Sequence, residues 1–185
     1  THRHEHQCLS DVFAYKHHSV TKSHNFCLTL RLSQFETYVP SDLRDLAVLM
    51  EPLTIAEKGL AQAWATQSRL PWVKHYEDGK PTGQGLKAVI LGAGPIGILG
   101  AMTMKAAGFE TYVYNRSPAP NPKAEIIESI GAHYISSKDV PFPALPAEIG
   151  SIALVYEAIG ISSVSFDVLS ILGVNGVYIF TGIPA

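Results

Sequence analysis

Short apolar runs alternate with segments of helical periodicity over the second half of the chain. Five short runs rich in apolar, β-branched or aromatic residues, as strands are, lie at residues 88–91, 111–115, 132–135, 152–156 and 177–180. The run at 152–156 is continuous and apolar, as a central parallel strand should be. Helical segments are predicted between them, at residues 95–107, 123–130 and 162–172, with a turn at Asn175-Gly176 before the last strand. This alternation predicts an α/β fold, a Rossmann doubly wound sheet of five parallel strands in the order 3-2-1-4-5.

The first 83 residues lack this alternation. Residues 26–32 alternate apolar and polar positions as a half-buried strand does, and apolar residues at helical spacing predict a helix within residues 40–68. The polar stretch 72–85 is expected to be an exposed loop. We therefore predict two parts, an N-terminal segment with a linking helix over residues 1–83 and a nucleotide-binding domain over residues 84–185.

Composition and charge exclude several classes of protein. Hydrophobic residues make up 46% of the chain and charged residues 16%, which suits a globular protein with a core and not a disordered one. A formal net charge of −2 gives no reason to expect a nucleic-acid or acidic-membrane partner. No apolar run reaches transmembrane length, and the N-terminus is too polar for a secretory signal. With only Cys8 and Cys27, we expect no disulfide framework and a reducing, cytoplasmic location.

Histidines gather in the N-terminal segment. Six of the eight lie before residue 25, at His2, His4, His6, His17, His18 and His24. Imidazole and thiolate groups bind zinc, but the spacing of these residues with Cys8 and Cys27 matches no zinc pattern. The simpler interpretation is a solvated, histidine-rich tail.

A glycine-rich turn follows the first strand of the predicted sheet. Gly92, Gly94 and Gly97 have the spacing G-x-G-x-x-G, which in a strand–turn–helix unit permits a tight turn, close approach of a pyrophosphate, and close packing of the helix on the strand. The phosphates would face the free N–H groups at the helix N-terminus. The residues between the glycines, expected to line the same site, are Ala93, Pro95 and Ile96.

The end of the second predicted strand indicates which dinucleotide is bound. An Asp or Glu at this place accepts hydrogen bonds from the ribose of NAD, and this chain instead has Asn115, Arg116 and Ser117. A neutral amide does not repel a 2′-phosphate, a guanidinium binds phosphate through charge-assisted hydrogen bonds, and a serine adds a small donor. The pattern favours NADP, with NAD as the alternative.

The other half of the site is expected along the carboxyl ends of the remaining strands. In a doubly wound sheet the ligand lies at the switch point between the first and fourth strands. That rule assigns the nicotinamide side to residues after the fourth and fifth predicted strands, namely Glu157, Ala158, Gly160, Thr181 and Gly182. No catalytic residue is identifiable from the pattern.

The last predicted strand, Val177–Phe180, lies at one edge of the sheet. A hydrophobic edge strand offers unpaired N–H and C=O groups to another chain. We therefore expect a homodimer or higher oligomer that forms through this edge.

With these segments assembled, residues 38–185 resemble the medium-chain dehydrogenase/reductase family, the zinc-type alcohol dehydrogenase superfamily, and within it the glucose dehydrogenase branch. The matching stretches are VLMEPLTIAEKGL, VILGAGPIG, the Asn115-Arg116 strand end, IIESIGAHYI, VYEAIG and GVYIFTGIPA. The resemblance implies an oxidoreductase that passes hydride from C1 of an aldose, or from another alcohol such as a polyol, to NADP. It also implies a catalytic zinc, for which Glu51 in the L-x-E-P segment would be a ligand.

The chain departs from the family pattern at both ends. Residues 1–36 contain no G-H-E histidine motif, and Cys8 and Cys27 lack the context of a zinc cysteine. The sixth Rossmann strand of the family is also absent, so we expect a protein truncated at both ends with a remnant of the catalytic domain. Two functions therefore stay open, an NADP-dependent dehydrogenase or part of one, and a non-catalytic dinucleotide-binding module or remnant. A flavin-binding or methyltransferase domain is disfavoured by Asn115 and by VYEAIG.

Overall fold

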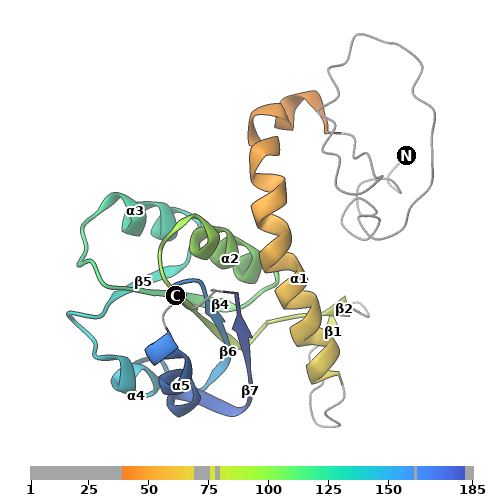
Figure 1. The fold of residues 1–185 in the computed structure, drawn as a ribbon. Helices are drawn as coiled ribbons and strands as arrows, with labels where there is room; N and C mark the ends of the chain where they lie inside the picture. Colours follow the sequence, from red (N-terminus) through yellow and green to blue (C-terminus); the bar gives the residue numbers. More distant parts are fainter. Residues whose placement is uncertain (1–38, 69–75, 78–79, 161, 182–185) are drawn as a thin grey trace. The chain divides into compact units, whose positions relative to one another are not determined.

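The computed structural model describes residues 39–68, 76–77, 80–160 and 162–181 (Figure 1). The strand predicted at 26–32, the histidine-rich segment, both cysteines and Gly182 lie outside the described residues. Contacts divide the chain after Met50 into two units, Thr1–Met50 and Glu51–Ala185, and each is described by itself.

The described part of the first unit is a 3₁₀ helix, η2 (Ser41–Leu49). Its first turn closes through the N–H of Leu43 and the carbonyl of Pro40, 3.0 Å apart. The helix predicted within residues 40–68 is therefore confirmed, although its first nine residues wind as a 3₁₀ helix and the α-helix begins only at Met50.

A parallel sheet forms the centre of the second unit. Its five strands are β3 (Lys87–Leu91), β4 (Glu110–Asn115), β5 (His133–Ser136), β6 (Ile152–Glu157) and β7 (Leu172–Phe180). They lie in the order β5-β4-β3-β6-β7, all neighbouring pairs parallel, which confirms the predicted order 3-2-1-4-5. The order reverses between β3 and β6. In doubly wound sheets, ligands bind at the carboxyl ends of the strands on either side of such a reversal.

Helices cover both faces of this sheet (Figure 1). One face packs against α1 (Met50–Gln67), α2 (Pro95–Ala106) and α3 (Pro122–Ser129), and the other against α4 (Leu145–Ile149), which follows the short η3 (Phe142–Ala144), and α5 (Ser162–Ile171). Successive residues of β3 supply the two cores in turn, with Ala88 and Ile90 in the first and Val89 and Leu91 in the second. Within the described residues, no helix combines the length and the apolar character that a membrane span needs.

The long helix α1 packs on the sheet through the face that its periodicity predicts. Ala56 and Ala63 are fully buried on that face. The ring of Trp64 stacks on Phe109, with ring centroids 5.4 Å apart and planes 15° from parallel. At Gly59 an added Cβ would come within 2.9 Å of the Ile179 side chain in β7, so the helix approaches the sheet closely there.

Strand β7 begins earlier than its sequence predicts. The sequence predicts the helix through Leu172 and the strand from Val177, but α5 ends at Ile171 and β7 starts at Leu172. The turn expected at Asn175-Gly176 is instead an irregularity inside the strand, because pairing with β6 slips between Leu172 and Val177 and Asn175 has a φ of 62°. An extra segment of this kind is a β-bulge, and Asn tolerates the left-handed conformation that it requires.

The polar stretch expected to be an exposed loop contains two short strands. β1 (Tyr76–Glu77) and β2 (Lys80–Pro81) form an antiparallel pair, with Tyr76 opposite Pro81 and Glu77 opposite Lys80. In the sequence, Asp-Gly stands between them, and this pair of residues is typical of two-residue hairpin turns. The prediction of an exposed loop over residues 72–85 therefore missed this short strand pair.

Candidate dinucleotide-binding site

The turn between β3 and α2 depends on glycine at two positions for reasons internal to the fold. Gly92 has a φ of +98°, and its N–H donates to the carbonyl of Tyr114 at 2.9 Å, which ties the end of β3 to β4. At Gly97, an added Cβ would lie only 2.0 Å from the carbonyl oxygen of Gly92. The first glycine thus supplies a left-handed turn and the third lets α2 lie against that turn, as the motif predicts.

Gly94 differs from the other two glycines of the motif. Its backbone has φ −81° and ψ 178°, which any residue adopts, and an added Cβ there would meet no protein atom within 4 Å. Nothing in the described protein therefore requires glycine at this position. The space above Gly94 is what a pyrophosphate needs to approach the backbone.

The N-terminus of α2 points into this space with its amides uncapped. Gly94 is the N-cap residue and makes no side-chain cap, and Pro95 occupies the first turn, where its missing N–H is not needed. The first intrahelical bond runs from the N–H of Ile98 to the carbonyl of Gly94 at 2.9 Å. Ala93 is buried behind the turn and Ile96 is half-buried. Free first-turn N–H groups and the helix dipole favour an anion at this place.

The end of β4 places Asn115, Arg116 and Ser117 beside the same turn. Asn115 is half-buried, and its Nδ2 donates to the hydroxyl of Tyr134 at 2.9 Å. Arg116 and Ser117 are exposed, and the guanidinium of Arg116 has no hydrogen bond or ion pair within the part of the chain that the structure describes. A free, exposed guanidinium at this strand end can bind an anionic ligand group without first breaking an internal ion pair.

The turn after β6 is held by a buried carboxylate. Glu157 is fully buried, and its Oε1 accepts hydrogen bonds from the N–H groups of Ile159 at 2.5 Å and Gly160 at 2.6 Å. The N–H of Ala158 donates to the carbonyl of Leu91 at 3.0 Å, which ties the turn to β3. The Glu157 side chain therefore organises the turn from within. The sequence places Glu157 beside the cofactor, but gives no sign of this internal role.

The turn after β6 also reaches Gly92 and the end of β7. The Ile159 side chain lies 3.1 Å from the position of a Cβ added at Gly92, so the two turns are in contact. The carbonyl of Glu157 accepts hydrogen bonds from Thr181 Oγ1 at 2.6 Å and from Thr181 N–H at 3.3 Å. The residues expected on the nicotinamide side, Glu157, Ala158, Gly160 and Thr181, thus form one connected group, and Gly182 lies outside the described residues.

Behind this group, Tyr156 fills the layer between the sheet and two helices. It is fully buried, and its ring leaves no space for a side chain at Gly100 of α2, where an added Cβ would come within 2.6 Å. Burial raises the pKa of the Tyr156 phenol above its ordinary value of 10.0. Sequence reasoning did not single out this residue, although a glycine inside a helix, such as Gly100, commonly marks a close approach.

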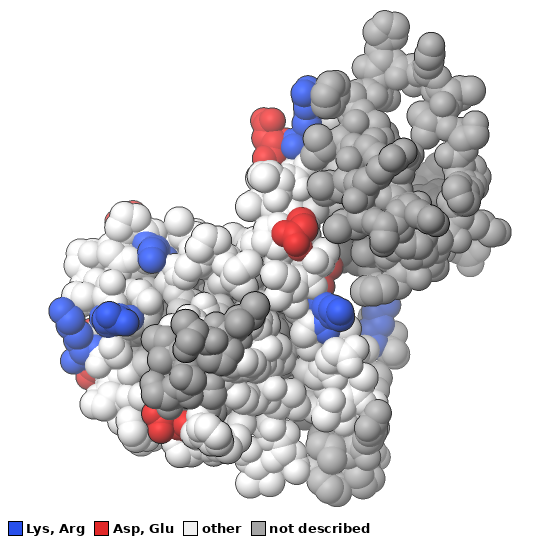
Figure 2. Space-filling view, viewed as in Figure 1, with Lys and Arg blue, Asp and Glu red and all other residues white. Residues whose placement is uncertain are grey.

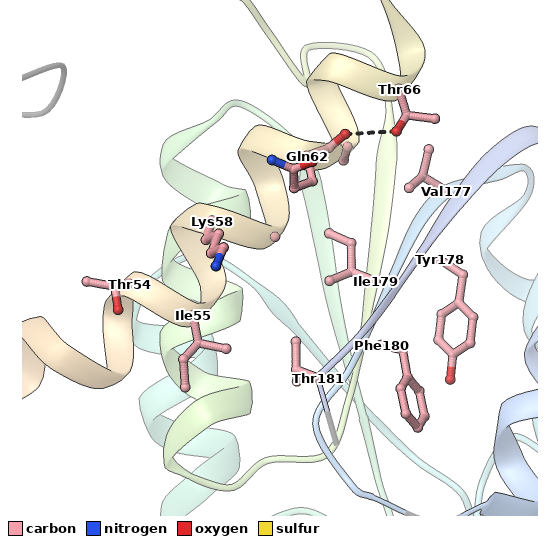
Figure 3. Close-up of a pocket in the computed structure, with 12 residues that line it drawn as sticks. Thr54, Ile55, Lys58, Gln62, Thr66, Val177, Tyr178, Ile179, Phe180 and Thr181 are labelled. Atoms are coloured by element: carbon pink, nitrogen blue, oxygen red, sulfur yellow. Dashed lines mark hydrogen bonds between the residues drawn. The ribbon is translucent and has the colours of Figure 1, made fainter. Parts of the chain in front are cut away.

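A groove of about 610 Å³ lies between α1 and β7 (Figure 3). Side chains from one face of α1, including Ile55, Lys58 and Gln62, face those of β7 across it, and Thr181 lies at one end. Thr181 belongs both to this groove and to the group around Glu157.

The face shown in Figure 2 carries only scattered charged side chains.

A family profile described as Glucose dehydrogenase C-terminus matches residues 44–185. The chain belongs to this family. The predicted resemblance to the glucose dehydrogenase branch is therefore confirmed.

The relatives of this glucose dehydrogenase family member are longer than the chain itself. Glucose 1-dehydrogenase of Methanocella arvoryzae is 34% identical over 145 residues, which are 78% of this chain and 37% of that protein. A solved structure of Haloferax mediterranei glucose dehydrogenase in complex with NADP, Zn and gluconolactone is 28% identical, with a TM-score of 0.70, over 83% of this chain and 41% of that one. The chain thus spans about two fifths of the length of these relatives. An alcohol dehydrogenase of Thermus sp. ATN1, 21% identical with a TM-score of 0.55 over 72% of this chain and 35% of that one, shares the fold.

The described residues of this family member provide no metal site around Glu51. The residue lies exposed in the first turn of α1, and the structure shows its carbonyl accepting a hydrogen bond from Thr54 Oγ1 at 2.6 Å. Across residues 39–68, 76–77, 80–160 and 162–181, no group of three or more His, Cys, Asp or Glu side chains could hold a metal ion. Because a catalytic zinc needs three protein ligands, the described residues alone do not fit that metal. Glu51 as a zinc ligand stays a prediction.

Proposed function

We propose that the chain binds NADP at the carboxyl ends of β3 and β6, over the β3–α2 turn and the β6 turn, as the cofactor-binding part of a glucose dehydrogenase-like oxidoreductase. The observation that supports this most strongly is the open space above Gly94, where a Cβ would meet nothing within 4 Å. The flanking glycines, by contrast, are required by a positive φ at Gly92 and by a close contact at Gly97. A glycine that the fold does not need is explained by a ligand that approaches the backbone. The pyrophosphate lies over Gly94 and accepts hydrogen bonds from the first-turn amides of α2.

Arg116 distinguishes NADP from NAD in this proposal. Its exposed guanidinium follows β4 directly, at the place where the adenosine ribose is read, and it binds the 2′-phosphate with Ser117 as a second donor. Asn115 replaces the carboxylate that would repel this phosphate. The finding that a relative's solved structure contains NADP agrees with this assignment.

The nicotinamide ring lies toward the turn of Ala158 and Gly160, with Thr181 and Gly182 beyond it. Glu157 holds this turn in place through two backbone N–H groups, so the wall that the ring meets is formed before the cofactor binds. When bound, NADP supplies the hydride acceptor for oxidation of an alcohol, and an aldose or polyol is the substrate class that the family suggests. No catalytic side chain of this chain is assigned.

A non-catalytic dinucleotide-binding module is the second candidate. It is favoured by the lack of a metal-binding cluster among the described residues. Incubation of the chain with glucose, NADP and zinc, followed by absorbance of the reduced cofactor, separates the two. Turnover supports the dehydrogenase, whereas saturable NADP binding without turnover supports the module for this chain alone.

The experiment that tests the cofactor assignment is an Arg116→Ala variant titrated with NADP and with NAD. Loss of charge-assisted hydrogen bonds of about 1.5–3 kcal/mol predicts a roughly 10- to 100-fold weaker Kd for NADP and a change of less than about twofold for NAD. Lys105→Ala, which removes a cation from the opposite end of α2, is the matched control and leaves both values unchanged. Equal losses for the two dinucleotides would contradict a 2′-phosphate role for Arg116.

We also propose that two copies associate through the outer edge of β7. This strand pairs with β6 on one side only within the described sheet, and it has nine residues, of which Val174 and Phe180 are exposed apolar side chains. An edge of this length and composition favours pairing with another strand. Light scattering at micromolar concentration gives the mass of a dimer or larger species under this proposal, and a monomer would contradict it.

A further inference from the structure

The hydroxyl of Tyr134 lies at the centre of a hydrogen-bonded cluster beside the predicted 2′-phosphate position. Tyr134 belongs to β5 and pairs in register with Val113 of β4. Its hydroxyl accepts from Asn115 Nδ2 at 2.9 Å and from Asn121 Nδ2 at 3.3 Å, and it donates to the carbonyl of Ser117 at 2.7 Å. A phenol hydroxyl has one proton to donate and two lone pairs to accept, so these three bonds use its full capacity.

These bonds fix the loop between β4 and α3 at three points. Asn115 is the last residue of β4, and Asn121 is the N-cap of α3, where its Oδ1 accepts from the N–H groups of Lys123 at 3.0 Å and Ala124 at 3.1 Å. Ser117 lies between them and is held through its backbone carbonyl. One hydroxyl of β5 therefore connects the end of a strand, the start of a helix and the segment in between.

Arg116 stands between two of the residues that Tyr134 holds. The Tyr134 hydroxyl forms no hydrogen bond with Arg116 itself. It binds the side chain of Asn115, the residue before Arg116, and the carbonyl of Ser117, the residue after it. Holding the Asn115 side chain on one side and the Ser117 carbonyl on the other restricts the directions that the exposed Arg116 side chain can take. A side chain that starts from a restricted position loses less conformational entropy when its ligand binds.

We propose that Tyr134 is a positioning residue that sets the preference for NADP over NAD, an inference that rests on the proposed NADP site. It does not touch the cofactor. It holds Arg116 and Ser117 where they meet a 2′-phosphate, a group that only NADP has. Loss of the hydroxyl therefore weakens the binding of NADP and leaves the binding of NAD nearly unaffected.

The test replaces only the hydroxyl, with Tyr134→Phe in the 185-residue chain. Calorimetric titration with each dinucleotide is expected to show NADP binding weakened about five- to tenfold and NAD binding changed less than about twofold. The expected loss for NADP is about the size of the net contribution of one neutral hydrogen bond. Tyr112→Phe is the matched control, because the Tyr112 hydroxyl bonds Glu110 at the other end of β4. It leaves both affinities unchanged. Equal weakening of the two dinucleotides by Tyr134→Phe overturns the proposal.

A double-mutant cycle adds a readout that a merely structural role would not move. In the Arg116→Ala background, Tyr134→Phe is expected to weaken NADP less than about twofold further, because the residue that it positions is gone. Full additivity of the two effects overturns the proposal.

If thermal unfolding shows that Tyr134→Phe is not folded, Asn121→Ser replaces it. A serine keeps a neutral cap on α3 but removes the amide that donates to Tyr134 and to the carbonyl of Pro118. It is expected to lower the NADP preference in the same direction, and an unchanged preference overturns the proposal. Failure of the unmodified chain to bind NADP would instead overturn the proposed function itself. If the Tyr134 or Asn121 variant is folded, binds NADP and keeps the preference of the unmodified chain for NADP over NAD, only the role of Tyr134 is overturned.

Discussion

The sharpest prediction contrasts two glycine-to-alanine substitutions three residues apart in the same motif. At Gly97 a new Cβ would lie 2.0 Å from the carbonyl oxygen of Gly92, more than 1 Å inside an ordinary contact of about 3.2 Å. At Gly94 it would meet nothing within 4 Å. The same chemical change is therefore expected to damage the fold at one position and only the binding of a ligand at the other.

The magnitudes follow from these distances. Gly97→Ala must separate α2 from the β3 turn, which overpacks a buried contact and costs about 3 kcal/mol of unfolding free energy or more. Gly94→Ala changes an N-cap residue with an ordinary φ of −81°, where the weaker capping of alanine and its smaller loss of backbone entropy nearly offset each other. The net change in its unfolding free energy is within about 0.5 kcal/mol. The methyl group that Gly94→Ala adds, however, keeps a pyrophosphate from the amides of α2 and weakens the binding of NADP at least about tenfold.

Urea unfolding with and without NADP measures both effects in one experiment. At about 100 times its Kd, NADP stabilises the unmodified chain by roughly 2.7 kcal/mol, and it stabilises Gly94→Ala by about 1.4 kcal/mol or less at the same concentration. Gly97→Ala unfolds at a lower urea concentration even without NADP. A Gly94→Ala variant that gains as much from NADP as the unmodified chain would refute the placement of the pyrophosphate over Gly94. Normal stability of Gly97→Ala would refute the packing argument.

Two further predictions concern the groups that support the site and the sheet. Glu157→Ala leaves two backbone N–H groups of the β6 turn without their acceptor, and chemical denaturation is expected to show an unfolding free energy lower by roughly 2–5 kcal/mol. Glu157→Gln keeps an acceptor oxygen and is expected to cost less than half as much. Equal losses in the two variants would contradict the hydrogen-bonding role of Glu157. Burial, a hydrogen bond to Glu110 and the charge of Glu110 raise the pKa of Tyr112 from 10.0 to about 12, so its contribution to stability is complete below pH 10 and is lost as the pH rises from 10 to about 12. Unfolding free energies measured across that interval should fall less steeply in Tyr112→Phe, and an identical slope in both proteins would refute the assignment.

Much of the fold could be predicted because its signals are local and continuous. Strands buried on both faces need unbroken apolar runs, and such a run at 152–156 is confirmed as β6, which lies inside the sheet between β3 and β7. The glycine motif could also be predicted from the sequence. Gly92 needs a positive φ and Gly97 needs a close backbone contact, and few residues other than glycine meet these two demands. Helix-to-strand boundaries were harder: the apolar stretch around Leu172 suits either structure, and only its pairing with Ile152 decides for a strand.

The interior of the candidate site could not be predicted, because it depends on contacts between distant residues. The sequence marks Glu157 as a polar residue at a strand end, and nothing near it indicates that its carboxylate is buried and accepts two turn amides. Tyr134 occupies a strand position that suits any aromatic residue, and its role emerges only when β5 lies beside β4 and brings its hydroxyl to Asn115 and Ser117. Side-chain hydrogen bonds across neighbouring strands have no periodicity in sequence for a pattern to detect.

Hydrogen–deuterium exchange of the chain with and without saturating NADP shows where on the chain the dinucleotide binds. It locates the bound cofactor on the backbone without any substitution. NADP bound at the proposed site is expected to slow exchange in peptides that cover residues 92–98, 115–117 and 157–160 and to leave peptides from α1 and α3 unchanged. Protection confined to the groove between α1 and β7, or no protection at all by NADP, would contradict the proposed site.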